Sequence, residues 1–152
     1  MSVAANMALR NFDARPHSRL GFFLNGPAIK RSARDLIARY RVKTPSADTP
    51  IRDLSGGNVQ RAVLARELSD GVEVLIAANP CFGLDFAAVA EIRSQIMAAR
   101  NRGAAVLLVS EDLDELLELS DRLVVMFHGR FVHEARASEA NLTEIGRHMA
   151  GH

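Results

Sequence analysis

The chain has 152 residues, of which 48% are hydrophobic and 24% charged, and its formal net charge at pH 7 is +1. These values are typical of a globular protein of one-domain size, and no apolar run approaches the roughly 20 residues that a membrane-crossing helix requires. The single cysteine, Cys81, excludes an internal disulfide, and residues 1–18 lack the apolar core of a signal peptide. Both features favour a reducing, cytosolic compartment.

The charge is distributed unevenly along the chain. Residues 1–52 carry ten Lys/Arg and three Asp/Glu, whereas the remaining residues carry nine and fifteen. The basic front third could face nucleic acid, anionic lipid or an acidic protein, although arginines on a solvated helix face are the commoner explanation. We therefore predict no nucleic-acid partner.

The front third is predicted to be a small, mainly helical piece. Within residues 20–24, four large apolar side chains either join the core or help to receive a partner. In residues 29–41, apolar side chains recur on one helical face, which predicts an amphipathic helix. Residues 43–53 contain two prolines with Ser, Thr and Asp, and predict a connecting loop. We therefore divide the chain into segments 1–50 and 51–152.

Beyond the loop, helices alternate with short apolar runs, a pattern typical of an α/β fold with a mostly parallel sheet. We expect helices at 55–68, 86–102, 112–119 and 141–149, buried strands at 72–77 and 104–109, and a third apolar strand at 122–127. The helix at 55–68 should stop at Ser69-Asp70-Gly71. The pair His128-Gly129 predicts a turn into a short strand at 131–134.

The most informative segment is Leu54-Ser55-Gly56-Gly57-Asn58-Val59-Gln60-Arg61, at the start of a predicted helix. Consecutive glycines are poor helix formers, so their presence requires a reason. Without Cβ atoms, the N–H groups of Gly56 and Gly57 can approach a phosphate closely, helped by the helix dipole and the Ser55 hydroxyl. The alternative is that Ser55 merely caps the helix and the glycines ease a turn. These residues alone leave both possibilities open.

The wider sequence resembles the ATP-binding cassette (ABC) family. LSGGNVQRAVLAREL is similar to that family's signature motif, which is LSGG followed by Gln or Asn, and Gly83-Leu84-Asp85 resembles its D-loop. VLIAANP and LLVSEDLDELLELSDRLVVM are similar to the Walker B and switch regions of the second cassette in tandem ATPases for simple sugars and nucleosides. The resemblance covers nearly the whole chain. It implies the C-terminal part of a RecA-like P-loop NTPase core preceded by a small helical subdomain.

The resemblance also implies a site that is shared between two cassettes. In this family, the signature of one cassette closes over ATP and Mg²⁺ that are held by its partner. Ser55, Gly56 and Gly57 would then contact the γ-phosphate in trans, with Asn58 and Gln60 nearby. Asp85, in the D-loop, would couple the two sites.

The cassette's own site is expected to be degenerate. The 152 residues contain no GxxxxGK[ST] loop. By the resemblance, Ala78 stands at the Walker B Asp, Asn79 at the catalytic Glu and Glu111 at the switch His. Alanine cannot ligate Mg²⁺ and Asn is not a useful base at neutral pH, so we expect no catalytic residue and no nucleotide binding by the isolated chain.

The implied partners are a second cassette, transmembrane permease subunits and, indirectly, a solute-binding protein, at the cytoplasmic face of the membrane. The transported solute would be a sugar or a nucleoside, and residues 20–24 would help to receive the permease. An isolated chain with an open sheet edge should self-associate. The alternatives are an interaction module without nucleotide contact and a stand-alone α/β phosphate-binding enzyme.

The histidines give little indication of a metal site. His17, His128, His133, His148 and His152 show no paired ligand spacing except for His128 and His133, which lie five apart across the predicted turn. Because no cysteine or further histidine accompanies that pair, we expect no metal site.

Overall fold

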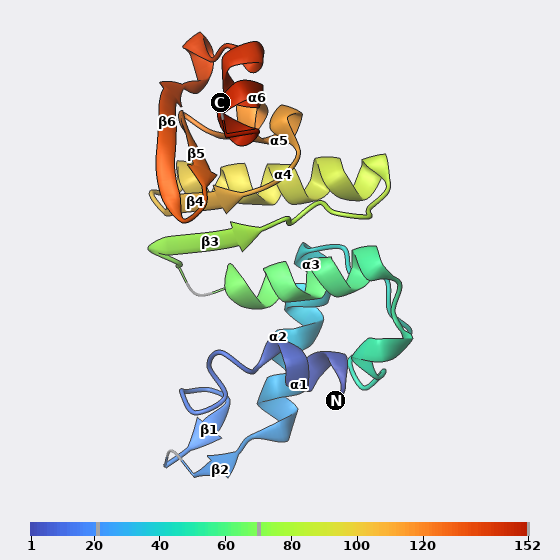
Figure 1. Ribbon diagram of the computed structural model, residues 1–152. Helices are drawn as coiled ribbons and strands as arrows, with labels where there is room; N and C mark the ends of the chain where they lie inside the picture. Colours follow the sequence, from blue (N-terminus) through green and yellow to red (C-terminus); the bar gives the residue numbers. More distant parts are fainter. Residues whose placement is uncertain (21, 70, 152) are drawn as a thin grey trace. The chain divides into compact units, whose positions relative to one another are not determined.

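The computed structural model describes residues 1–20, 22–69 and 71–151 (Figure 1). The chain divides into two compact units. The first unit is Met1–Leu75 with Pro80–Val106, and the second is Ile76–Asn79 with Leu107–His152. Asp70, part of the predicted helix stop, and His152 lie outside the described residues. The boundary that we place after residue 50 stays a prediction.

The first unit contains four helices and a small hairpin in its described part. The helices are α1 (Val3–Met7), α2 (Gly26–Arg39), α3 (Gly56–Glu67) and α4 (Phe86–Asn101), and a 3-10 turn covers Ile51–Asp53. The hairpin pairs β1 (Ser18–Arg19) with β2 (Phe23–Leu24) in antiparallel fashion. α1 contacts both α2 and α3, and α3 contacts α4, so the helices enclose one apolar core.

The amphipathic helix predicted at 29–41 is confirmed as α2. Its Ala33 side chain is 1% exposed, and Tyr40, just after its last turn, is equally buried. Ile29, Leu36 and Ile37 pack against the same core, as the apolar period predicts. The Asn25 side chain caps this helix by accepting a hydrogen bond from the N–H of Ala28 at 3.4 Å.

Of the two alternatives for the four large apolar side chains within residues 20–24, the one that places them in the core is wrong. Leu20 and Phe22 are 84% and 89% exposed, and Phe23 and Leu24 are also exposed. These residues lie on and between the two-residue strands of the β1–β2 hairpin. A hairpin this short buries little of its own side-chain surface.

Strands β3 (Val74–Ala78) and β4 (Ala105–Val109) pair with each other. The N–H of Ala105 donates to the carbonyl of Glu73 at 2.8 Å, and the N–H of Asn79 donates to the carbonyl of Val109 at 2.7 Å. Residue numbers rise in the same direction along both strands, so the pair is parallel, as predicted.

The prediction that these two strands are buried is correct for only one face of β3. Leu75 and Ala77 are buried, whereas Val74 and Ile76 are 61% and 69% exposed. In β4, Leu107 and other alternate side chains are likewise exposed. Successive side chains of a strand point to opposite faces, and no described element covers the second face of this pair.

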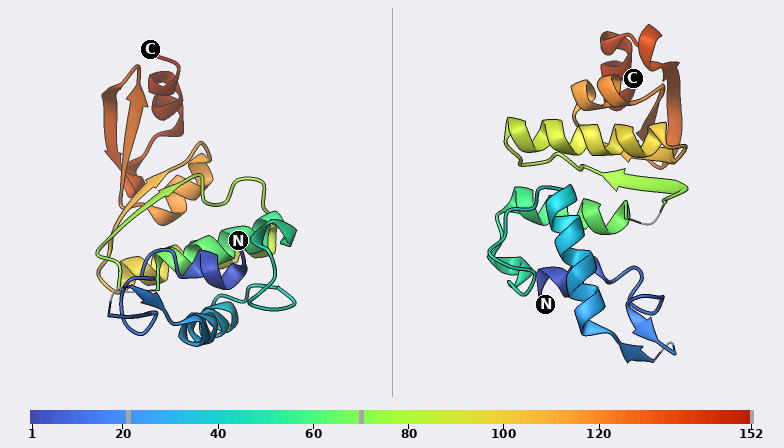
Figure 2. Two further views of the ribbon diagram at one scale, coloured as in Figure 1. Left: turned by 90° about the horizontal axis from the view of Figure 1, so that it is seen from below. Right: turned by 180° about the vertical axis from the view of Figure 1, so that it is seen from behind.

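The second unit combines a hairpin with two helices. It contains α5 (Leu113–Leu119), β5 (Arg122–Phe127), β6 (Arg130–Arg136), a 3-10 turn at Ala137–Glu139 and α6 (Leu142–Met149). α6, the last helix in the colour ramp, lies alongside β5 in Figures 1 and 2. Ile145 of α6 is 2% exposed and packs with Leu123 and Val125 of β5.

The predicted turn at His128-Gly129 is confirmed. His128 and Gly129 have φ angles of 46° and 76°, which is the two-residue turn geometry that matches the twist of a hairpin. The third apolar strand predicted at 122–127 is confirmed as β5, which pairs with β6 in antiparallel fashion. In the described ranges, no helix has both the length and the apolar content that crossing a membrane would require.

Candidate functional site

The candidate site is built on the first turn of α3. Ser55 precedes the helix with extended backbone angles, φ −65° and ψ 156°. Its carbonyl accepts hydrogen bonds from the N–H groups of Asn58 and Val59, both at 2.9 Å. The N–H groups of Gly56 and Gly57 belong to the first turn of the helix, where no intrahelical acceptor exists. The helix therefore presents free amide donors at the position that the sequence singles out.

The Ser55 hydroxyl does not cap the helix. It accepts a hydrogen bond from the Asn58 side-chain amide at 2.9 Å, and makes no bond to the N–H groups of the first turn. The Asn58 carbonyl oxygen in turn accepts from the backbone N–H of Lys43 at 2.7 Å. Asn58 thus ties the hydroxyl of Ser55 to the loop that precedes the helix, and simple capping does not explain the serine.

Local geometry does not require a glycine at position 56. A Cβ atom there would have no heavy atom within 4 Å, and neither Gly56 nor Gly57 has a positive φ. A Cβ at Gly57 would lie 3.6 Å from Cβ of Ala88 and 3.8 Å from Leu84, which is ordinary contact distance. The idea that the glycines ease a turn is therefore not supported, and Gly56 lacks an internal reason for being glycine.

The residues that we predict to form a D-loop belong to the same unit as this turn. The Gln60 side chain donates to the carbonyl of Pro80 at 3.4 Å, which connects α3 to the segment after β3. Gly83 has a φ of 71°, a value that glycine adopts without strain. Asp85 precedes α4 and its carboxylate accepts from the N–H of Ala88 at 2.8 Å. Asp85 therefore has a clear structural role as the N-cap of α4.

The three positions that we expect to be degenerate all fall in the second unit. Ala78 is exposed at the end of β3. Asn79 has a left-handed backbone, with φ 45°, and its side-chain oxygen accepts from the N–H of Glu111 at 3.2 Å. The structure thus brings Asn79 and Glu111 together at the carboxyl ends of the parallel strands, where Asn79 supports the backbone.

The turn after β4 is held by a second polar contact. The Ser110 hydroxyl donates to a carboxylate oxygen of Glu115 at 2.6 Å and accepts from the N–H of Asp112 at 3.1 Å. Glu115 is only 1% exposed. The Asp112 side chain accepts from the N–H groups of Asp114 and Glu115 and so caps α5.

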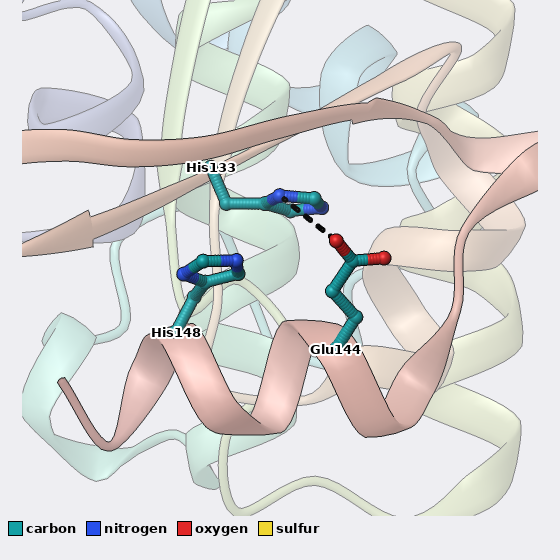
Figure 3. Close-up of side chains that lie close together, drawn as sticks. All are labelled: His133, Glu144 and His148. Carbon is teal, nitrogen blue, oxygen red and sulfur yellow. Dashed lines mark ion pairs between the residues drawn. The ribbon is translucent and has the colours of Figure 1, made fainter. Parts of the chain in front are cut away.

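One cluster escaped the sequence analysis. His133 of β6 lies beside Glu144 and His148 of α6, and one ligand atom from each residue lies within 4.8 Å of the others (Figure 3). His128, which we paired with His133 from their spacing, is not in this cluster. The missed signal is the four-residue spacing of Glu144 and His148 in a predicted helix, which places both on one face.

Comparison with known proteins gives the wider context. No family model matches the chain. The chain is 40% identical over 149 residues to the guanosine import ATP-binding protein NupO of Bacillus subtilis, covering 98% of this chain and 29% of NupO. It is 42% identical over 142 residues to the arabinose import ATP-binding protein AraG 1 of Burkholderia cenocepacia, covering 92% of this chain and 28% of AraG 1. The chain therefore spans less than a third of the length of these relatives.

Solved structures show the same fold. A dimeric ATP-binding cassette in a post-hydrolysis state, bound to ADP and Pi, superposes with a TM-score of 0.74 at 19% sequence identity. The match covers 90% of this chain and 57% of that one. The described helices, the parallel β3–β4 pair and the antiparallel β5–β6 pair are consistent with this match. The chain has the α/β fold of the C-terminal part of a P-loop NTPase core of the ABC type.

Proposed function

We propose that the chain is the signature-bearing part of an ATP-binding subunit that energises the import of a small solute through an ABC transporter. The names of its relatives support a nucleoside or a sugar as the solute, since NupO imports guanosine and AraG 1 arabinose. In this proposal, the chain corresponds to the C-terminal half of the second of two cassettes.

The first turn of α3 would contact ATP that is held by a partner cassette. The observation that carries this step is the open space at Gly56, where a Cβ atom would meet nothing within 4 Å. Neither packing nor backbone angle requires glycine there, and the absence of a side chain lets a molecule from outside the chain approach the backbone closely. The free N–H groups of Gly56 and Gly57 and the positive end of α3 suit a phosphate. Asn58 orients the Ser55 hydroxyl, and Gln60 holds the turn near the D-loop.

The chain itself would supply no catalytic group. Ala78 offers no ligand for Mg²⁺, and the Asn79 side chain accepts a backbone hydrogen bond from Glu111. Mg²⁺ and the attacking water would be handled by the partner cassette, and Asp85 would couple the two sites. The partners would be a second cassette, permease subunits and a solute-binding protein, at the cytoplasmic face of the membrane.

Substitution of Ser55 by Arg in the complete transporter tests the shared site. Ser55 is exposed just before the first turn of α3, so a bulky cation should block the approach of the nucleotide without disturbing the core. Ser94→Arg, at an exposed position of α4, is the matched control. We expect ATP turnover to be lost in Ser55→Arg and retained in Ser94→Arg, with both variants still copurifying with the permease.

This experiment and two binding measurements on the isolated chain distinguish the alternatives. Unchanged ATP turnover in Ser55→Arg would exclude the shared site and favour an interaction module. The stand-alone enzyme would instead show phosphate-ester binding by the isolated chain. Restoration of nucleotide binding when the chain is mixed with a fragment that carries a Walker A loop would support the shared site directly.

A further inference from the structure

The His133–Glu144–His148 cluster has the side chains of a transition-metal site. His133 Nδ1 lies 4.0 Å from a carboxylate oxygen of Glu144, and the His133 and His148 rings are stacked with centroids 4.6 Å apart and planes at 12°. One ligand atom from each residue lies within 4.8 Å of the other two. Figure 3 shows the three side chains pointing into the space between β6 and α6.

The backbone that carries these residues is fixed by packing. His133 lies directly opposite Val125 in the antiparallel register, so both side chains lie on the same face of the hairpin. Val125 is buried in the cluster that contains Ile145 of α6, and this face therefore points toward α6. Glu144 and His148 are one helical turn apart and flank Ile145, which is 2% exposed. The strand and the helix thus hold the three side chains face to face.

We propose that His133, Glu144 and His148 bind a divalent transition-metal ion of the zinc class. Two imidazoles and one carboxylate favour Zn²⁺, Co²⁺ or Ni²⁺, whereas Mg²⁺ and Ca²⁺ prefer oxygen ligands alone. Three protein ligands leave at least one coordination position for water or a further donor. This site uses no residue of the first turn of α3, and its proposal does not depend on the function proposed for that turn.

Binding requires only local movement of side chains. Ligand atoms around a tetrahedral zinc ion lie roughly 3.3 Å apart, because each is about 2.0–2.1 Å from the metal. The atoms of this cluster must therefore approach one another, and the stacked rings must tilt so that both nitrogen lone pairs point to one position. The Glu144 side chain is 55% exposed and so has room to change rotamer, while the His133 side chain is 17% exposed and more constrained. The alternative is that stacking and the ion pair merely help to dock α6 on the hairpin.

Zinc binding by the full 152-residue chain, prepared without a histidine tag, distinguishes these two roles. Affinity is measured by isothermal titration and by competition with a zinc indicator, and Co²⁺ replaces Zn²⁺ for visible absorption spectra. His148→Ala and Glu144→Gln remove ligands at the surface of α6. His128→Ala, in the exposed turn of the same hairpin, and Glu139→Gln, at an exposed position before α6, are the controls.

We expect one zinc ion per chain, with affinity weakened by about tenfold or more in His148→Ala and Glu144→Gln and unchanged in both controls. The Co²⁺ complex should show the visible bands of a low-coordinate site, and these should disappear in His148→Ala. Glu144→Gln is an isosteric change at an exposed side chain, so it keeps the test valid if His148→Ala unfolds. Absence of saturable zinc binding, equal affinity in all variants, or equally tight binding of Mg²⁺ would overturn the proposal.

Discussion

Substitution of Gly56 by Ala tests whether the glycine is needed for the stability of the chain or for contact with the proposed nucleotide. Gly56 is the first residue of α3, it is exposed, and an added Cβ would have no neighbour within 4 Å. Alanine is the better helix former and has less freedom in the unfolded chain. The free energy of unfolding should therefore stay the same or rise by up to about 1 kcal/mol. For a chain of this size, that gain raises Tm by about 2–4 °C.

ATP turnover should change in the opposite direction. A methyl group at position 56 would keep a phosphate from approaching the first turn of α3 and would weaken its hydrogen bonds to the N–H groups. A hydrogen bond to a charged group contributes about 1.5–3 kcal/mol. If one such contact is lost in the transition state, turnover falls by roughly 10- to 150-fold.

Gly146→Ala provides the comparison. Gly146 lies within α6, is exposed, and also has no heavy atom within 4 Å of an added Cβ. It should gain up to about 1 kcal/mol in stability, with no effect on turnover. Stability is measured by thermal unfolding of the isolated chain followed by circular dichroism, and turnover by phosphate release from the complete transporter. Normal ATP turnover in Gly56→Ala would refute the proposal that a phosphate approaches the backbone at this position. A destabilised Gly56→Ala chain would refute the statement that packing does not require glycine there.

Two further predictions concern stability. Asp85→Ala removes the N-cap of α4 and should lower the free energy of unfolding by about 1 kcal/mol. Asp85→Asn should preserve this free energy because Asn caps a helix equally well. Equal urea midpoints for Asp85→Ala and wild type would contradict the prediction. Burial raises the pKa of Tyr40 above its ordinary value of 10.0, opposed by Arg39 and Arg102. Since the unfolded chain ionises first, this contribution to stability is present below pH 10 and is lost as the pH rises through the folded-state pKa. Among the described residues, the Tyr40 hydroxyl is buried without a hydrogen-bond partner. Tyr40→Phe should therefore be at least as stable as wild type at pH 7. Its free energy of unfolding, measured in urea, should fall less than that of wild type when the pH is raised to 11. An equal decline in both chains would exclude Tyr40 as the source.

The helices were predictable because their apolar period and end signals are local. The apolar face of α2, Gly103 after α4 and the pair His128-Gly129 each specify structure through residues that are close in sequence. Gly103 has a φ of 101°, as expected for a glycine that ends a helix. In these cases, the information lies within the element itself.

Burial was less predictable because it depends on what covers each face. Val74 and Ile76 have the sequence of a buried strand, but their face of the β3–β4 pair is exposed. Phe22 is apolar and yet 89% exposed, because no other described element covers its side chain. Composition gives the tendency of a side chain to be buried, and only the packing of the whole chain decides whether it is.

The two candidate sites also differ in how far the sequence alone could predict them. The first turn of α3 was predicted from the order of the motifs around it. Its residues alone could not exclude simple capping by Ser55, and the hydrogen bond from Asn58 to Ser55 argues against capping. The cluster of His133 with Glu144 and His148 required the docking of a strand against a helix. His133 is eleven residues from Glu144 and fifteen from His148, and only the four-residue spacing of Glu144 and His148 within α6 is a local signal.

The closeness of Gly57 to Ala88, where a Cβ added to Gly57 would lie 3.6 Å from Cβ of Ala88, has an electrostatic consequence. These residues belong to the first turns of α3 and α4, so two helix ends that each carry about half a positive charge lie side by side. The carboxylate of Asp85 neutralises the end of α4, whereas the first turn of α3 contains no acidic residue. The positive end of α3 therefore has no acidic side chain in its own first turn to neutralise it, and its attraction for an anion should weaken with ionic strength. An anion that binds there would do for α3 what the carboxylate of Asp85 does for α4.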